Sequence, residues 1–581
     1  MKKSYLKIMS GVLVGACLLT YSCKDSFLDV QPIGALSQSV LADKKGAEAL
    51  LIGAYSLLDG QGAGGNWNTS GTNWVYGSVV GGDANKGSDA GDQPDINPMV
   101  RYEATPTNSY FDAKWVTIYE GVSRSNGVLR TIAQAKDASA ADKTRISAEA
   151  RFLRAHYHFE AKKMWNNIPF VDENNVDYKL PNDKDAWANI EADLKFAYDN
   201  LPGSGLDAGR ANKWAAGAMY AKCLLFQKKF TEAKNVLDAV IANGTTPGGV
   251  KYALNAKFSE AFTASNRNSA EAVFSIQYSI NDGSGAANAA AGDVLNFPYK
   301  GGASPGGCCG FFQPTQELVN SFRVDANGLP LVNGSYNTPA LAVKSDQNLT
   351  PANPFTPDAG TLDPRLDWTV GRRGIPYRDW GIYTGSDWVR DQSHGGPYSP
   401  IKNTYDKAQE GKYTDGTSWT SGYTANNYSI IRFADVLLWA AEAEVEVGSL
   451  ERARTLVNQV RTRAANRDGF VKTASGAPAA NYVINNYNSP WTDKEAARAA
   501  VRFERKLELA MEGHRFFDLV RWGIAATALN DYMKVEGAAG RTFLNGATFR
   551  AGKSEYFPIP QRQIDLQSAG GTSTLKQNPG Y

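Results

Sequence analysis

The chain has 581 residues, of which 43% are hydrophobic and 21% are charged, and its formal net charge is +2. This length can bury a large core, in one domain or in a few lobes. The near-neutral charge provides no long-range field for nucleic acid or an anionic membrane surface, so binding to either through charge is excluded. Aromatic residues reach 11% and there are 56 Gly, which is typical of long loops that carry flat side chains.

The first 22 residues are predicted to be a lipoprotein signal peptide. Three lysines among the first seven residues precede an apolar run, 8–19, which is shorter than the roughly 20 residues of a membrane span. The run ends at Leu19–Cys23, a pattern that resembles a bacterial lipobox, in which Cys23 would become the diacylated first residue. The alternative is an ordinary signal peptide that happens to contain this cysteine. We therefore expect a lipid-anchored and otherwise water-soluble protein.

Apolar residues then recur at helical spacing in several segments. The last of these segments closes at Leu201-Pro202-Gly203, a helix stop signal. Cys223, in a later apolar helical stretch, is expected to be a small core residue. The predicted early helices are Leu41–Leu58, Phe111–Ala135, Ala148–Trp165 and Ala186–Asn200.

Two later segments share one pattern. Ala218–Val240 aligns without gaps on Leu438–Val460, with small residues such as Ala221 and Ala441 in matching places. Each segment reads as helix, tight turn and helix, with small residues where two helices must approach closely. This is the logic of tetratricopeptide-like units. The sequence therefore predicts a mostly α fold: a helical-hairpin scaffold with long irregular insertions and a few short strands.

Three insertions interrupt this scaffold, at 60–108, 281–314 and 328–427. They contain turn signals such as Asp282-Gly283, and a strand-like run, 272–278, precedes the second of them. Loops this long inside a compact protein are usually functional. In the second insertion, Cys308 and Cys309 are adjacent within a glycine-rich stretch, and an exported protein allows such a pair to persist as a vicinal disulfide.

Paired carboxylates raise the question of catalysis. Glu504, Glu508 and Glu512 lie four apart and would share one helix face, as a glycosidase or a metal site requires. Arg505, Arg515 and Arg521 crowd the same segment, so an ion network that fixes the C-terminal helices is the favoured interpretation. A surface glycoside hydrolase that uses this stripe remains an alternative. No nucleophile, phosphate-loop or dinucleotide motif accompanies it, so no enzymatic activity is predicted.

Metal ligation has little support in the sequence. No zinc-binding pattern of histidines or cysteines occurs. The run Asp83–Asp92 offers several oxygen donors, but it lacks the downstream bidentate glutamate of a calcium loop. We expect a plain polar loop there and no cofactor; a structural calcium ion is the alternative.

Several motifs, in order along residues 23–581, together resemble the SusD/RagB family of surface lipoproteins of Bacteroidota. The Glu504–Gly523 segment is the most specific of them. The others are Asp25–Asp29 after the lipobox, Ala148–Ala155, Asn167–Phe170, Asp363–Leu366, Ile431–Leu438, Tyr556–Pro560 and the closing Gln577–Tyr581.

The resemblance implies a helical fold with tetratricopeptide-like units, an N-terminal helical region at 23–240 and a C-terminal region at 241–581, packed as one globular unit. It also implies a SusC-like TonB-dependent β-barrel partner, for which the chain would serve as a lid. The implied task is to capture oligosaccharides at the cell exterior, on the outer membrane, and to deliver them to the barrel. Some relatives serve peptide import, so a peptide-binding lid of the RagB type is the alternative.

The insertions supply residues suited to sugar, because sugars present C–H faces to aromatic rings and hydroxyls to polar groups. We hypothesise that the first and third insertions converge, with the Cys308–Cys309 loop between them as a sugar-facing edge. Trp74 and Trp388 would be stacking surfaces. The ordinary alternative is that the aromatic residues pack the loops onto the scaffold. The predicted ligand-binding residues are Trp67, Asn73, Trp74, Asp83, Lys86, Cys308, Cys309, Tyr377, Trp388, Arg390 and Tyr398. The composition of the loops does not name the glycan.

Overall fold

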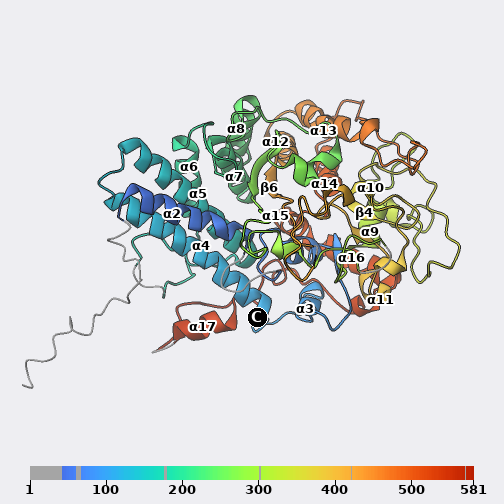
Figure 1. Cartoon of the computed structure of the whole chain (residues 1–581), viewed down its shortest axis with the longest axis horizontal. Helices are drawn as coiled ribbons and strands as arrows, with labels where there is room; N and C mark the ends of the chain where they lie inside the picture. The colour runs from blue at the N-terminus through green and yellow to red at the C-terminus, as the bar shows by residue number, and fades with distance from the viewer. Residues whose placement is uncertain (1–41, 61–66, 176–178, 300–302, 421, 569–570) are drawn as a thin grey trace, which may run out of the picture.

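The structure is a computed structural model that describes residues 42–60, 67–175, 179–299, 303–420, 422–568 and 571–581 (Figure 1). The predicted signal peptide and Cys23 lie outside the described residues. Within the described ranges, no helix has the length and hydropathy of a membrane span.

The N-terminal helices lie side by side at one end of the molecule (Figure 1). Each packs on its neighbour, because apolar residues at helical spacing form one buried stripe. Asp43 and Ser139 cap the first and third of them through hydrogen bonds to backbone amides. The helices are α2 (Lys44–Tyr55), α4 (Ser109–Gln134), α5 (Ala140–Trp165) and α6 (Trp187–Asn200). The four helices predicted from the sequence are therefore confirmed.

The two matching segments form two matching hairpins. The first is α7 (Lys213–Phe226) with α8 (Phe230–Asn243), and the second is α12 (Phe433–Val447) with α13 (Leu450–Ala464). Helix α8 packs against α12, so hairpins about 220 residues apart in the chain lie side by side. Cys223 is fully buried in α7, as expected. The mostly α, helical-hairpin fold is confirmed.

The C-terminal part adds helices around the second hairpin. Helix α14 (Lys494–Glu508) packs against α12 and α13, and α15 (Arg515–Arg521) follows after the turn at Gly513. Gly513 has a φ of +76°, and a Cβ there would lie 2.0 Å from the Thr72 carbonyl oxygen, so glycine permits this close approach. The other α-helices of the described residues are α3 (Ile96–Val100), α9 (Gln316–Ser321), α10 (Leu366–Thr369), α11 (Gln392–Gly395), α16 (Ala525–Ala538) and α17 (Gln561–Ser568).

Besides the short helices α3, α10 and α11, short antiparallel strand pairs organise the insertions and the segments that flank them. Strand β1 (Ala84–Gly87) pairs with β3 (Phe311–Pro314), which joins the first insertion to the second. Strand β4 (Val370–Gly371) pairs with β5 (Ser399–Pro400) inside the third. Strand β2 (Ala272–Ile276) pairs with β6 (Tyr428–Arg432), which leads into α12. The strand pairs therefore fasten the first insertion to the second, and β2–β6 brings the start of the second beside the end of the third.

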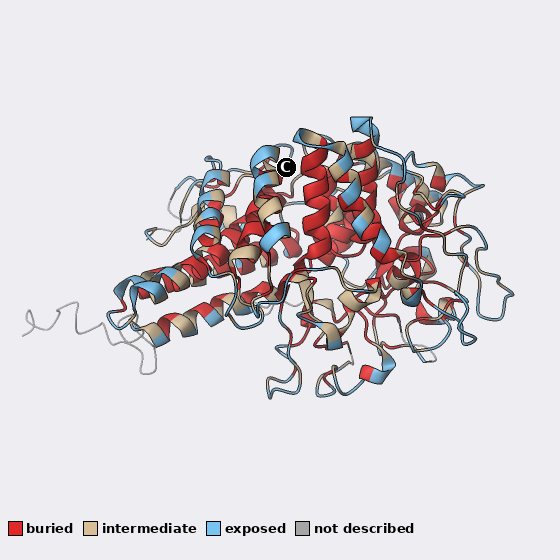
Figure 2. Cartoon of the chain, turned by 90° about the horizontal axis from the view of Figure 1, so that it is seen from above, coloured by how far each residue is buried: buried red, intermediate tan, exposed pale blue. Residues whose placement is uncertain are grey.

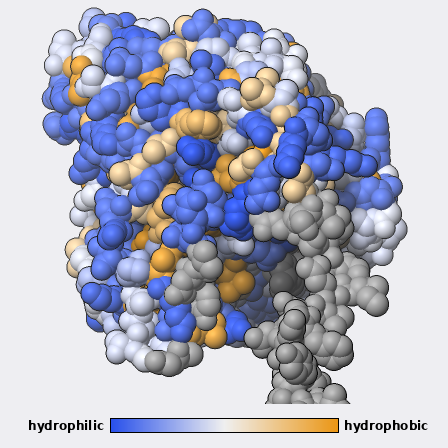
Figure 3. Space-filling model, turned by 90° about the vertical axis from the view of Figure 1, so that its left-hand side faces the viewer, coloured by the Kyte–Doolittle hydropathy of each residue, from blue (hydrophilic) through white to orange (hydrophobic). Residues whose placement is uncertain are grey.

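Most of the buried apolar side chains belong to one large core. Figure 2 shows buried residues concentrated on the central helices and exposed residues along the peripheral loops. The face at the α2 and α6 end is mainly hydrophilic, with scattered apolar residues (Figure 3). Since polar stripes of the outer helices face solvent there, the recesses of functional interest lie where loops meet the scaffold.

Candidate functional site

The three insertions meet around one pocket, and this convergence is what the sequence predicted. Thr72 and Trp74 come from the first insertion, Asp293 from the second, and Asn403 and other residues from the third. The cavity volume is about 60 Å³, room for several water-sized groups, since one water needs roughly 10–15 Å³. The aromatic, amide, hydroxyl and charged side chains of its lining include Thr72, Trp74, Asp293, Phe297, Phe312, Lys402, Asn403, Asn426, Asn427, Arg432 and Glu512.

Aromatic rings form the inner part of the pocket. The Trp74 ring meets Phe312 edge-on at 5.8 Å and Phe311 at 6.1 Å, and Trp74 is only 1% exposed. Its indole N–H is buried and has no hydrogen-bond partner among the described residues. An unpaired buried donor is costly, and such a group is satisfied by water or by a ligand. Trp74 therefore belongs to the pocket lining and is not the open stacking surface that we expected.

Asp293 gives the pocket a carboxyl group with few partners. Its Oδ1 accepts hydrogen bonds from Thr72 Oγ1 at 2.8 Å and from Asn296 Nδ2 at 3.2 Å. Burial raises the pKa of Asp293 to about 6, and these two hydrogen bonds offset only part of the rise. No cation is paired with this carboxyl among the ion pairs of the described residues. Asp293 is therefore available to accept a hydrogen bond from a hydroxylated ligand.

A buried ion cluster forms another wall. Lys402 Nζ contacts Glu512 Oε1 at 2.6 Å, and Arg432 Nε contacts Glu512 Oε2 at 2.8 Å. Burial alone would raise the pKa of Glu512, but Arg432 and Lys402 outweigh it and lower that pKa to about 2. Burial lowers the pKa of Lys402 to about 8, against the opposing charge of Glu512. Both carboxylate oxygens of Glu512 are thus held by cations.

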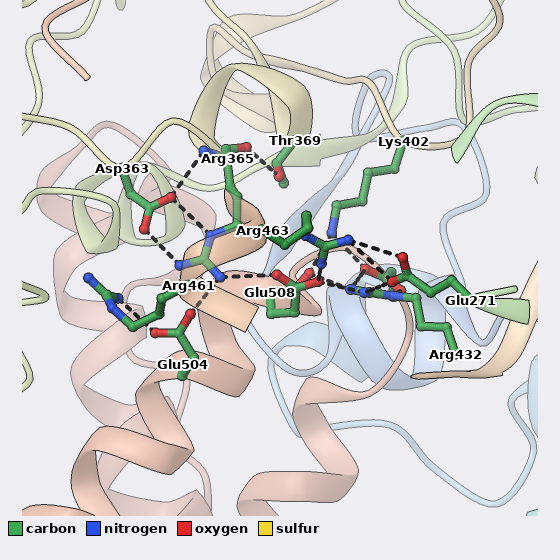
Figure 4. Close-up of polar contacts among 11 residues, drawn as sticks. Glu271, Asp363, Arg365, Thr369, Lys402, Arg432, Arg461, Arg463, Glu504 and Glu508 are labelled. Atoms are coloured by element: carbon green, nitrogen blue, oxygen red, sulfur yellow. Dashed lines mark hydrogen bonds and ion pairs between the residues drawn. The ribbon is translucent and has the colours of Figure 1, made fainter. Parts of the chain in front are cut away.

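This wall continues into the ion network drawn in Figure 4. Glu508 accepts hydrogen bonds from Arg365, Arg432 and Arg463. Glu504 pairs with Arg365 at 2.7 Å and with Arg461 at 2.8 Å. The predicted network of the glutamate stripe is confirmed, but its cations come from elsewhere in the chain.

The arginines that we expected as partners have other contacts. Arg505 pairs with Asp518 at 2.9 Å, and Arg521 pairs with Asp518 at 2.8 Å and with Glu442. The Arg515 charge lies near Asp83 and lowers the pKa that burial of Asp83 raises. Arginines adjacent in sequence to the glutamates project from other faces of the helix, so those that face the stripe had to come from other elements.

The first and third insertions also meet at the cysteine loop. Cys308 and Cys309 are joined by a disulfide, and the peptide bond between them is cis. Gly310, the next residue, accepts a hydrogen bond from Ser88 N at 2.5 Å. Arg390 pairs with Asp89 at 2.6 Å and with Asp92 at 2.8 Å. Cys308 is partly exposed beside these contacts, whereas Cys309 is buried.

The predicted aromatic residues of the third insertion form a small core of their own. Tyr377, Tyr383 and Trp388 pack together, with Trp388 only 2% exposed and Tyr377 fully buried. Tyr398 is also buried, and its hydroxyl donates to Gln316 at 2.8 Å. Trp388 therefore presents no open ring face for the stacking role that we expected of it. These rings pack the loop instead, as the alternative held.

The polar residues predicted in the first insertion are likewise buried. Asp83 accepts hydrogen bonds from Ser78 Oγ and from Met511 N. Asn73 donates to Glu160 at 2.8 Å, and Lys86 donates to the carbonyl oxygens of Asp89 and Asp92. These three side chains are at least 95% buried and are engaged by protein groups, and none of them lines the pocket described above.

Two further expectations concern this insertion. Trp67 is partly buried and packs against the main core. In the Asp83–Asp92 run, the Asp89 and Asp92 carboxylates that a calcium ion would need pair with Arg390 of the third insertion, and Lys86 donates to the Asp89 carbonyl oxygen. Within the described ranges, no cluster of three or more acidic, histidine or cysteine side chains is suited to hold a metal ion.

The pocket residues that sequence reasoning missed are Asp293, Lys402, Asn403, Asn426 and Asn427. All lie within the second and third insertions. The paired asparagines before β6 were a usable signal, because amides suit hydroxyl recognition. Asp293 and Lys402 gave no local signal, since their proximity depends on how the loops fold.

Comparisons with known proteins agree with this architecture. A model described as the SusD family matches residues 270–581, and one described as starch-binding associating with outer membrane matches residues 26–225. SusD-like protein P2 of Formosa agariphila is 23% identical over 97% of this chain and 98% of its own length. SusD-like protein P25 of the same organism is 24% identical over 72% of this chain and 71% of its own.

Solved structures show the same fold. A laminarin binding SusD-like protein superposes with a TM-score of 0.65 and 24% identity, covering 93% of this chain and 100% of that one. Surface glycan-binding protein A from Bacteroides thetaiotaomicron, in complex with laminarihexaose, superposes with a TM-score of 0.65 and 22% sequence identity. The match covers 92% of this chain and 99% of that one. The expected fold is thus confirmed by structural neighbours.

Proposed function

The chain belongs to the SusD family, and from this we propose that it binds oligosaccharides at the cell surface and passes them to a SusC-like TonB-dependent transporter of the outer membrane. Relatives with the same fold are named for binding laminarin or laminarihexaose. The proposal extends that kind of ligand, a neutral or modified glycan, to this chain.

The observation that carries the proposal is the pocket at the meeting point of the three insertions. It combines the buried Trp74 ring with the Asp293 carboxyl, the Lys402 ammonium and three partly exposed asparagine side chains. Small numbers of placed polar groups on an apolar wall are typical of small-molecule sites. Its volume of about 60 Å³ suits the hydroxyl edge of one sugar unit better than a whole oligosaccharide.

Binding without turnover is part of the proposal. Glycoside hydrolysis requires two carboxyl groups that are free to act as acid and as base or nucleophile. Glu512 lines the same pocket as Asp293, but both its oxygens are held by Arg432 and Lys402. Glu504 and Glu508 are buried among arginines. These engagements support capture and release as the function.

The anchoring part of the proposal rests on sequence. Cys23 follows an apolar run of signal-peptide length, and we propose that diacylation of this residue tethers the mature protein to the outer membrane, facing the cell exterior. Radiolabelled palmitate incorporated into the wild type and not into Cys23→Ser would support this tether. Equal labelling of the two proteins would contradict it.

Glycan binding is tested on protein that begins after Cys23. A glycan array and a peptide pool separate the proposed ligand from the peptide alternative. Calorimetry then compares the wild type with Asp293→Asn and Asn403→Ala, and with Asp531→Asn as the control, because the Asp531 side chain is 63% exposed on α16. We expect the two pocket variants to bind the glycan about fivefold to fiftyfold more weakly than the wild type. The control variant should bind it with the affinity of the wild type. Selective peptide binding, or unchanged affinity in both pocket variants, would overturn the assignment.

A further inference from the structure

The pocket is the first of four adjoining hollows along the β2–β6 strand pair. The second hollow is narrow, with a cavity volume of about 20 Å³, and the third has a volume of about 190 Å³. The fourth lies beside α2 and, at about 390 Å³, is the largest of these four. Asn427 lines the first and second, Asn268 the second and third, and Gln277 the third and fourth. Three amide side chains therefore stand at the three junctions.

These amides touch one another. Asn268 Nδ2 donates to Gln277 Oε1 at 2.8 Å, Gln277 Nε2 donates to Asn268 Oδ1 at 2.9 Å, and Asn427 Nδ2 donates to Gln277 Oε1 at 2.9 Å. Asn268 and Gln277 are exposed and Asn427 is partly exposed. Because water already competes for these hydrogen bonds, sugar hydroxyls can replace them at little cost.

The walls of the groove provide apolar contact. Ile52 and Val250, 58% and 57% exposed, line the last two hollows. The opposite wall, at Ala208–Arg210, lies close to Gln277, and a Cβ on Gly209 would lie 2.4 Å from Gln277 Cγ. Glycine, with φ at +88°, therefore allows the loop to close one side of the groove.

The charge along the groove favours an uncharged ligand. Five carboxylates and four cations line the four hollows, with no run of cations that a sulfated or uronic chain would require. The carboxylates are Asp59, Asp207, Glu271, Asp293 and Glu512, and the cations are Arg210, Arg267, Lys402 and Arg432.

The strand edge beside the groove is poorly suited to a peptide. A peptide that extends a sheet needs free backbone groups along the edge strand. Along β2, the Ser275 carbonyl oxygen accepts a hydrogen bond from Gln277 Nε2 at 3.1 Å, and the Val273 carbonyl oxygen accepts one from Tyr252 at 3.5 Å. Side chains thus occupy part of this edge.

We infer that these hollows form one extended groove that binds an uncharged, linear oligosaccharide along β2, with one unit of the chain in the pocket. The inference rests on the proposed function and adds the ligand's length, charge and path. Strand β2 alone, five residues long, spans about 16 Å, which exceeds the length of a single sugar ring. Longer oligosaccharides should therefore bind more tightly than short ones.

The test compares disaccharides and hexasaccharides of neutral glucans, xylan and chitin by calorimetry. Ala208→Trp places an indole ring where the last two hollows meet, since Ala208 lines both from an exposed position, and Gln277→Ala removes the amide shared by the same two. Ala141→Trp is the matched control, because Ala141 is exposed at the start of α5 and lines none of the four hollows.

In the wild type and in Ala141→Trp, the hexasaccharide should bind about tenfold more tightly than the disaccharide. Ala208→Trp should abolish this advantage and Gln277→Ala should reduce it about threefold, with disaccharide affinity unchanged in both. Equal affinity for both lengths, or an advantage that survives in Ala208→Trp, would overturn the groove and leave the proposed function standing. Tighter binding of sulfated or uronic oligosaccharides than of neutral ones would overturn the inference that the ligand is uncharged. Failure of every glycan to bind would overturn the proposed function itself.

Discussion

The carboxylates of Glu504 and Glu508 and the carboxyl of Asp293 lie in one connected region but differ in how fully they are paired. Glu504 and Glu508 are fully buried, and arginines from the residue before α10, from strand β6 and from helix α13 hold their oxygens. Asp293 has two neutral hydrogen-bond donors and a raised pKa. Complete pairing makes the first set a structural element, and incomplete pairing leaves the second able to bind. Glu512 stands between them, since it lines the pocket and is paired.

The largest effect is expected in the network. Glu508→Gln keeps the shape of the side chain but leaves Arg365, Arg432 and Arg463 facing a neutral amide. Breaking a buried pair in this way costs about 3–5 kcal/mol of unfolding free energy, measured by denaturant unfolding. Glu495→Gln is the control, because Glu495 is 81% exposed and should change stability by under about 0.5 kcal/mol. Equal losses in the two variants would show that pairing does not distinguish the buried glutamates.

A smaller and opposite effect is expected in the pocket. Folding raises the pKa of Asp293 to about 6 from the usual 3.8, so the folded state binds this proton more tightly and loses stability as pH rises from about 4 to 6. Asp293→Asn removes this loss. It should be more stable than the wild type at pH 7 by about 1–3 kcal/mol and nearly equal to it at pH 4. Unfolding curves at the two pH values test this, and a variant less stable at pH 7 would contradict it.

Lowering the pH should destabilise the wild type by protonating a fully paired carboxylate, Glu512. The cations around Glu512 lower its pKa to about 2, below the usual 4.5. Its contribution to stability is complete above pH 4.5 and is lost as pH falls toward 2. We expect the unfolding free energy of the wild type to decrease over that range by about 1–3 kcal/mol more than that of Glu512→Gln. The same slope in both proteins would remove Glu512 from the acid response.

The smallest effect is expected at the exposed ion pairs beside the cysteine loop. The Arg390 side chain is 35% exposed, and its partners Asp89 and Asp92 are similarly open. Surface pairs contribute at most about 1 kcal/mol, so Arg390→Gln should lower stability by no more than that amount. Thermal unfolding at low and high salt measures it. A loss as large as that of Glu508→Gln would show that this junction is a structural core.

The sequence predicted the site at the level of segments better than at the level of residues. The three insertions converge as expected, because short strand pairs and ion pairs join them. The individual aromatics were not placed by the sequence: Trp388 and Tyr377 are as suited to sugar as any exposed ring, but they bury each other. An aromatic side chain has the same composition signal in a core and in a binding site, so only its neighbours decide its role.

Sequence alone determined the helices, the repeated hairpin, the family and the existence of a glutamate network, because these follow from periodicity, a helix stop signal, small residues at helix contacts and an ordered set of motifs. The tertiary structure decided which arginines neutralise Glu504, Glu508 and Glu512, and which polar groups remain with few partners. Those arginines are up to 143 residues away, as with Arg365 and Glu508. Charge pairing and burial depend on distances in space, and spacing along the chain does not encode those distances for irregular loops.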